Sequence, residues 1–370
     1  MSAASQVPAA PANPHHHNNF GLLRLLLAVA VVFSHAFSVA TGRVDDEPLA
    51  VSTGLTLGSH AVNAFFAISG YLVVMSYDRR GWRDYVLARA LRIIPGFLVA
   101  TLLVSLVLGA AMTRLDLSAY LTHPQLWTFI WRTLTTFKSA AALPGVFEGN
   151  PLQFPLGTVW TLKYEVLCYL GVLVAGLAGL LARRKLALAI WALLVLAVIL
   201  RATFLPDGSK GVETAMRLPL IFLTGSLIYL WRDRVPLSIP GLVGAAVGVA
   251  LLSATPLYTA ALYVVTAWGT LVIALAPALT RFRTEPPSDL SYGIYLYGWP
   301  VQQAFFALFP GVGIITAFWP GLAITALVAW LSWHLVEKPA MDLKRRLMGG
   351  PKGARPAPRS GSTSAGAAAP

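Results

Sequence analysis

Long apolar runs recur along the whole chain and constrain what it can fold into. They are rich in Leu, Val, Ala and Gly and last about 18–22 residues each, the length that crosses a hydrocarbon core as a helix. They lack the period-two alternation of barrel strands. Only 12% of the 370 residues are charged and 56% are hydrophobic, whereas a soluble domain carries about 25% charged residues. We therefore expect an all-α integral membrane protein with lipid as its solvent.

The apolar runs predict a bundle of about ten transmembrane helices. Residues 1–19 are expected to form a flexible tail, 20–345 one polytopic membrane domain, and 346–370 a disordered basic tail. Residues 113–157 are long, aromatic and interrupted by proline, and should lie on or dip into one membrane face. No repeat of fixed period is evident. The predicted spans are Phe20–Ala40, Ala61–Ser76, Arg92–Met112, Thr158–Leu181, Leu186–Leu205, Arg217–Trp231, Ile239–Ala254, Leu257–Ala276, Ser291–Phe309 and Val312–Val336.

The formal net charge of +13 is explained by membrane topology better than by nucleic-acid binding. The loops on the side that holds both termini carry 20 Lys and Arg residues, and the opposite side carries 8. Because basic loops stay in the cytoplasm, both termini are predicted to be cytoplasmic. Cys168, the single cysteine, can form no internal disulfide. The histidines at 15–17 lie in a Pro/Ala tail, so no metal site is expected.

The first predicted span carries an arginine and a histidine. Arg24 lies near the cytoplasmic end, and His35 follows eleven positions later near mid-depth, about 16 Å along the helix and just over three turns away. Both side chains therefore point to nearly the same face and could line one cavity. Ionisable residues inside a span are costly, which predicts a function for them. A snorkelling anchor is the alternative for Arg24, and a satisfied core residue is the alternative for His35.

Five arginines lie in or beside the loop after the second span. Arg89 and Arg92 are three positions apart and share a helix face. Paired guanidinium groups match the geometry of phosphate. Positive-inside topology explains Arg79, Arg80 and Arg83 well, but it explains the other two less well because they enter an apolar span.

A carboxylate lies in the opening turns of the fourth span, near the outer face by this topology. Thr161 and Tyr169 stand four residues to either side of Glu165, so the three share a helix face. Such a carboxylate could orient or charge-stabilise an imidazole, or bind substrate hydroxyls. A local pair with Lys163 is the alternative, although a spacing of two is poor geometry for it.

Six motifs in register resemble the acyltransferase 3 family of membrane O-acyltransferases, across nearly all of residues 20–345. Many members of that family carry a histidine just before the proline of the fifth motif. Here Gly298 and Trp299 precede Pro300, which argues against a mechanism that needs a second histidine there. The motifs are R-x10-H at Arg24 and His35, AFFAISGYLV at 64–73, R-x-x-R at Arg89 and Arg92 before Pro95, W-T-L-x-x-E at 160–165, SYGIYLYGWPV at 291–301 and WHLVEKPA at 333–340.

The resemblance implies transfer of an acyl group, usually acetyl, from cytoplasmic acyl-CoA to a hydroxyl of an extracytoplasmic or lipid-linked carbohydrate. His35 and Glu165 would be catalytic, with His35 as general base or as acyl carrier. Arg24, Arg89 and Arg92 would hold the phosphates of coenzyme A.

The partners would then be acyl-CoA, the glycan acceptor and the lipid bilayer of the inner cell membrane. Acetyl-CoA would be a co-substrate, and no tightly bound cofactor, metal or nucleic acid is expected. The competing hypothesis is a transporter or flippase in which His35, Arg24 and Glu165 form a proton or anion relay. The absence of an evident inverted repeat argues against it.

Overall fold

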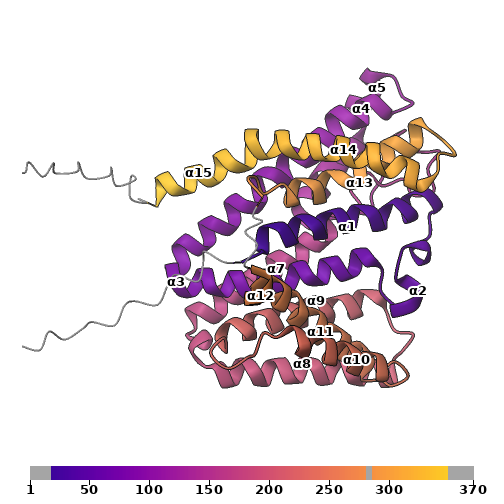
Figure 1. The fold of residues 1–370 in the computed structure, drawn as a ribbon. Helices are drawn as coiled ribbons and strands as arrows, with labels where there is room; N and C mark the ends of the chain where they lie inside the picture. The colour runs from indigo at the N-terminus through magenta and orange to yellow at the C-terminus, as the bar shows by residue number, and fades with distance from the viewer. Residues whose placement is uncertain (1–17, 281–285, 349–370) are drawn as a thin grey trace, which may run out of the picture.

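The computed structural model describes residues 18–280 and 286–348, which form a bundle of helices (Figure 1). No β-strand occurs within these residues. The expected all-α, multi-pass membrane fold is confirmed, because seven described helical segments are long and apolar enough to cross a bilayer. These segments are Phe20–Thr41, Leu57–Met112, Trp160–Leu177, Arg184–Phe204, Lys210–Leu230, Tyr258–Leu275 and Ile314–Leu347.

The second and third predicted spans belong to one continuous segment. Helix α3 (Leu57–Leu102) passes through a π-helical stretch (Leu103–Leu108) into α4 (Gly109–Met112). At Gly81 the backbone has φ 75° and ψ 176°, outside the helical region. Glycine adopts positive φ at little cost, so the segment changes direction there. Its 56 residues exceed what one crossing needs.

Each remaining predicted span coincides with a helix, with shifted ends. Helix α9 begins at Lys210, well before the predicted start at Arg217, because its first turns are too polar for a hydropathy criterion. The Ser209 side chain caps this start by accepting a hydrogen bond from the Gly211 N–H. The helices are α1 (Phe20–Thr41), α7 (Trp160–Leu177), α8 (Arg184–Phe204), α9 (Lys210–Leu230), α10 (Ile239–Leu251), α11 (Tyr258–Leu275), α13 (Ser291–Leu308) and α14 (Ile314–Ser332).

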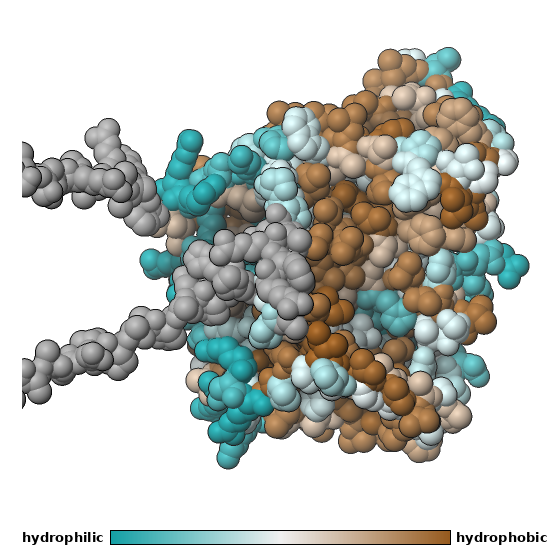
Figure 2. Space-filling view, viewed as in Figure 1, coloured by the Kyte–Doolittle hydropathy of each residue, from teal (hydrophilic) through white to brown (hydrophobic). Residues whose placement is uncertain are grey.

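Short helices mark the two ends of the bundle. In Figure 1, α15 (Lys338–Leu347) lies on the left, and α2 (Ala50–Thr53) and α5 (Leu117–Thr122) lie on the right. We call these the α15 end and the α2 end. Between them the surface is dominated by hydrophobic side chains (Figure 2), as a lipid-facing belt requires. The remaining short helices are α6 (Pro124–Thr136) and α12 (Pro277–Thr280).

Two predicted tails fall largely outside the described residues. Residues 1–17, which include the three histidines, and residues 349–370 are not described, and neither are Arg281 and Arg283 of the topology count. The last described helix, α15, ends at Leu347, close to the boundary predicted at residue 345.

Helices α3 and α9 approach each other through glycines. A Cβ atom on Gly70 would lie 1.9 Å from the Phe222 carbonyl oxygen, and one on Gly225 would lie 2.1 Å from the Ala67 carbonyl oxygen. Membrane helices associate through small residues that allow this backbone contact. Gly70 therefore serves packing, although it belongs to one of the six sequence motifs.

Gly70→Ala should force α3 and α9 apart and lower the melting temperature of the detergent-solubilised protein by several degrees or more. Gly171→Ala in α7 is the matched control, because no atom beyond its chain neighbours and its own helix backbone lies within 4 Å of the added Cβ. The control should melt at or slightly above the parental temperature, since alanine favours the helix. Equal melting of Gly70→Ala and the parent would contradict this account of the α3–α9 contact.

Candidate active site

A cavity of about 340 Å³ lies among α1, α3, α7, α13 and α15. Arg24, Arg89, Arg92 and Glu165 all line it, so the structure brings four of the five predicted site residues together. Four basic side chains line it in total, the fourth being Lys344 of α15, against two acidic ones. We call it the arginine cavity.

Asp289 holds two of the arginines together. Its Oδ2 atom lies 3.2 Å from Arg24 Nη1 and 2.8 Å from Arg92 Nη2, and Ser291 Oγ donates to its Oδ1 at 2.6 Å. Burial raises the pKa of the Asp289 carboxyl, but the two guanidinium groups outweigh burial and hold that pKa well below its usual range. Arg92 also lies 3.9 Å from buried Glu337.

Sequence reasoning missed Asp289 and gave Glu337 no role. Glu337 lies inside the last of the six motifs, and Asp289 precedes the fifth by two positions. The sequence did contain one indication of such carboxylates. Two arginines that enter apolar spans carry positive charges that need negatively charged groups nearby.

Arg89 is the least satisfied of the three arginines. Its Nε atom is buried and has no hydrogen-bond partner among the described residues. Its guanidinium carbon lies 5.6 Å from the centre of the Tyr169 ring. A ligand with strong acceptor oxygens would satisfy this donor, because a buried unpaired donor is costly.

Glu165 lies on the face that its sequence spacing predicted. Thr161, Glu165 and Tyr169 all line the arginine cavity, and the Tyr169 hydroxyl donates to Glu165. The alternative pair with Lys163 does not form, since that ammonium lies over the Tyr164 ring. Glu165 shares its cavity with Arg24 and Lys344, two residues that the predicted topology placed on the opposite side of the membrane from it.

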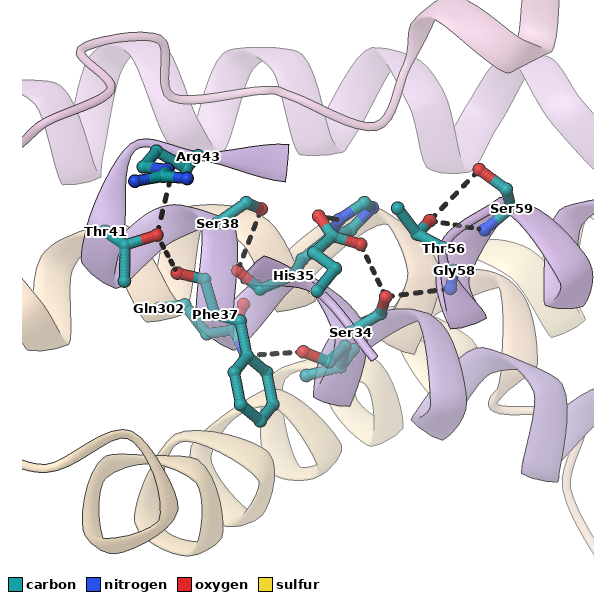
Figure 3. Close-up of polar contacts among 12 residues, drawn as sticks. Ser34, His35, Phe37, Ser38, Thr41, Arg43, Thr56, Gly58, Ser59 and Gln302 are labelled. Atoms are coloured by element: carbon teal, nitrogen blue, oxygen red, sulfur yellow. Dashed lines mark hydrogen bonds and ion pairs between the residues drawn. The ribbon is translucent and has the colours of Figure 1, made fainter. Parts of the chain in front are cut away.

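His35 lies outside the arginine cavity, in a second polar cluster nearer the α2 end. On α1 it lies past the midpoint of the helix, six residues or about 9 Å of rise from its end at Thr41. Its Nδ1 atom lies 3.1 Å from Oε1 of Glu47, a residue only 4% exposed. Ser34 Oγ donates to the other carboxylate oxygen at 2.5 Å and accepts from the Gly58 N–H at 2.8 Å (Figure 3).

The carboxylate beside His35 is thus Glu47 and not Glu165. Asp45, Asp46 and Glu47 are consecutive acidic residues, and nothing in the sequence of that run distinguishes its third member. In the structure a 3-10 turn (Val44–Asp46) leads the chain back, so that Glu47 alone of the three is buried.

The contact fixes the hydrogen bonding of the imidazole. Burial raises the pKa of Glu47, but hydrogen bonds from His35 and Ser34 outweigh it and hold that pKa below its usual value. An ionised carboxylate only accepts, so His35 donates from Nδ1. In the neutral ring the Nε2 lone pair is then free to take a proton or attack a carbonyl.

Helix α13 connects the two clusters. Tyr295 lines the arginine cavity, and Trp299, one turn further along, contacts the His35 ring edge-to-face at 5.1 Å between centroids. One turn advances about 6 Å. A Cβ atom on Gly298 would lie 2.4 Å from Val32 Cγ2, so this tight α1–α13 contact leaves no room for a larger side chain at that position.

Comparisons with known proteins agree with the motifs. The acyltransferase domain family matches residues 17–336. Nodulation protein 10 of Rhizobium leguminosarum bv. viciae is 29% identical over 91% of this chain and 98% of its own length. An O-acetyl transferase of Shigella phage Sf6 is 26% identical over 88% of this chain and 96% of its own length. No solved structure matches the chain.

Asp289→Asn should destabilise the protein, because it leaves Arg24 and Arg92 without their shared carboxylate. Breaking a fully buried pair costs about 3–5 kcal/mol, and the partial exposure of these groups places the cost below that range. A loss of several degrees in melting temperature is expected. Asp233→Asn is the control, since its pair with Arg184 is solvent-exposed and should matter little. Equal melting of both variants would refute the anchoring role of Asp289.

Proposed function

The chain belongs to the acyltransferase 3 family of membrane O-acyltransferases, and from this premise we propose that it transfers an acetyl group from cytoplasmic acetyl-CoA to a hydroxyl of an extracytoplasmic or lipid-linked carbohydrate. Its resemblance to an O-acetyl transferase over most of both chains supports acetyl as the group. The same relationship favours an enzyme over a transporter or flippase. The observation that carries the mechanism is the contact of His35 with Glu47.

His35 is the residue proposed to act on the reacting atoms. As general base, Nε2 takes the proton of the acceptor hydroxyl while its oxygen attacks the thioester carbonyl. The new C–O bond forms, the C–S bond breaks, and the proton passes to the departing thiolate of coenzyme A. As acyl carrier, Nε2 would attack the carbonyl first and then pass the acetyl group to the hydroxyl. Glu47 is a positioning residue on either route, because it orients the ring and stabilises its charged form.

The arginine cavity is proposed to hold the donor. Its excess of basic side chains suits a polyanion, and the free Nε of Arg89 suits a phosphate oxygen. From there the long pantetheine arm would run past Tyr295 toward His35. Glu165 faces the same cavity and would hold N–H or O–H groups of the bound substrate.

The α15 end is proposed to face the cytoplasm across the inner cell membrane. Lys344, Arg345 and Arg346 lie in the last turn of α15, as the positive-inside rule requires. The segment Leu57–Met112 is long enough to cross twice. With α10 and α13 also crossing, the chain would span the bilayer about ten times.

Arg89→Ala should weaken acetyl-CoA binding roughly 10- to 100-fold, because a charge-assisted hydrogen bond to phosphate is lost. Parental binding should itself weaken as salt rises. Arg89→Lys should restore only part of the affinity, since an ammonium cannot bind phosphate bidentately. Isothermal titration of the purified protein measures each value. Arg83→Ala is the control, because Arg83 is exposed and lies outside the cavity. Unchanged affinity in Arg89→Ala would leave Arg89 as a topology signal only.

His35→Ala should lower transfer at least about 100-fold while acetyl-CoA binding stays near the parental value. Glu47→Gln should lower kcat with little change in KM, because the amide can present an N–H to Nδ1 and favour the wrong tautomer. Release of free coenzyme A and acetylation of a carbohydrate acceptor are the readouts. Near-parental turnover of well-folded His35→Ala would refute the mechanism. Loss of donor binding with intact single-turnover chemistry would instead make His35 a binding residue.

A further inference from the structure

A second polar cavity of about 340 Å³ lies at the α2 end of the bundle. The last turns of α1 and α13 form two of its walls, and the segment 145–151 forms another. We call it the distal cleft. The lining residues used below are Val39, Arg114, Phe147, Glu148, Asn150 and Phe306.

The distal cleft lies just beyond the His35 cluster. On α1, Val39 follows His35 by four residues, which is about one turn and 6 Å. On α13, Gln303 follows Trp299 by the same spacing, and it accepts two hydrogen bonds from the Asn150 side chain at 2.9 and 2.6 Å. Two helices therefore place this cleft about one turn from the imidazole, on the side away from the arginine cavity.

The lining of the cleft differs in charge from that of the arginine cavity. Its charged groups are one cation and one anion, Arg114 and Glu148, 3.5 Å apart with side chains 72% and 48% exposed. Such a solvent-exposed ion pair is weak, so the guanidinium donors and the carboxylate oxygens can form hydrogen bonds to a ligand instead. Phe306 adds apolar surface. Balanced charge, both hydrogen-bonding senses and an aromatic face suit a neutral polyhydroxylated molecule with apolar C–H faces, and offer a polyanion little.

The wall that carries Glu148 is held rigidly. Thr113 Oγ1 donates to the Pro144 carbonyl at 2.8 Å, and the Arg114 N–H donates to the Gly145 carbonyl at 3.0 Å. Phe147 adopts φ 58°, the left-handed region that a bulky residue seldom occupies. The packing of the buried Phe147 side chain holds this strained conformation in place. A preorganised wall loses little entropy when a ligand binds.

We propose that the distal cleft binds the acceptor, as an uncharged sugar unit of a carbohydrate whose free hydroxyl then reaches Nε2 of His35. This inference rests on the proposed acetyl transfer and adds to it where the acceptor lies and what its chemistry is. Donor and acceptor then occupy separate cavities on opposite sides of the imidazole.

A cysteine placed in the cleft tests the inference. The full chain carries Cys168→Ser to remove its native thiol, plus Glu148→Cys in one variant and Ser118→Cys in the control. Ser118 is exposed on α5 and does not line the cleft. Intact cells are treated with a bulky, membrane-impermeant maleimide and the protein is purified. Two quantities are then measured, the affinity for acetyl-CoA and the transfer of acetyl groups to polysaccharide. The polysaccharide is taken from the surface of the producing cell and is first treated with mild base to remove its acetyl groups.

Labelled Glu148→Cys should retain parental acetyl-CoA affinity and lose at least nine-tenths of the transfer to the polysaccharide. Labelled Ser118→Cys should keep both the affinity and the transfer. Without label, Glu148→Ala should raise KM for the polysaccharide about tenfold with kcat largely unchanged. Full transfer by labelled Glu148→Cys, no labelling from outside the cell, or loss of donor affinity would each overturn the inference. Failure of the proposed function would give a different result, because the unlabelled parent protein would then release no coenzyme A. In that case the inference about the acceptor would also fail.

Discussion

Arginines that enter a membrane bundle need compensation, and the carboxylate of Asp289 provides it for two of them. It ties Arg24 of α1 to Arg92 of α3 and stands two residues before α13. Three elements far apart in sequence are therefore fixed around one anion. Because Arg92 also approaches buried Glu337, the C-terminal segment is joined to the same cluster. The arginine cavity exists because these pairs hold its walls in place.

The chemistry that this arrangement permits is divided between two sites. Strongly basic residues line the arginine cavity, whereas the imidazole of His35 lies about one turn of α13 further on, with its own carboxylate. A donor with charged and reactive ends that lie far apart fits this division. The separation therefore favours group transfer over transport.

Much of this could be predicted from the sequence, and the limits have identifiable causes. Hydropathy located the apolar helices, and helical periodicity placed Thr161, Glu165 and Tyr169 on one face, as the structure has them. The same periodicity gave Arg24 and His35 a common direction but not a common cavity, because a shared face says nothing of what packs between two points along a helix. The sequence indicated that the buried arginines need a carboxylate nearby, but not that Asp289 provides it, and it did not single out Glu47. Both lie in loops, where backbone conformation decides which of several acidic residues turns inward.

The central claim is that an acetyl group passes from a donor at the α15 end to an acceptor at the α2 end. Sealed proteoliposomes of one protein orientation test it most directly. Acetyl-CoA with a labelled acetyl group is added on the α15 side only, and deacetylated polysaccharide is confined to the α2 side. The account predicts labelled ester on the enclosed polysaccharide and an equal amount of free coenzyme A on the donor side. Transfer that occurs only when both substrates share a compartment would contradict it.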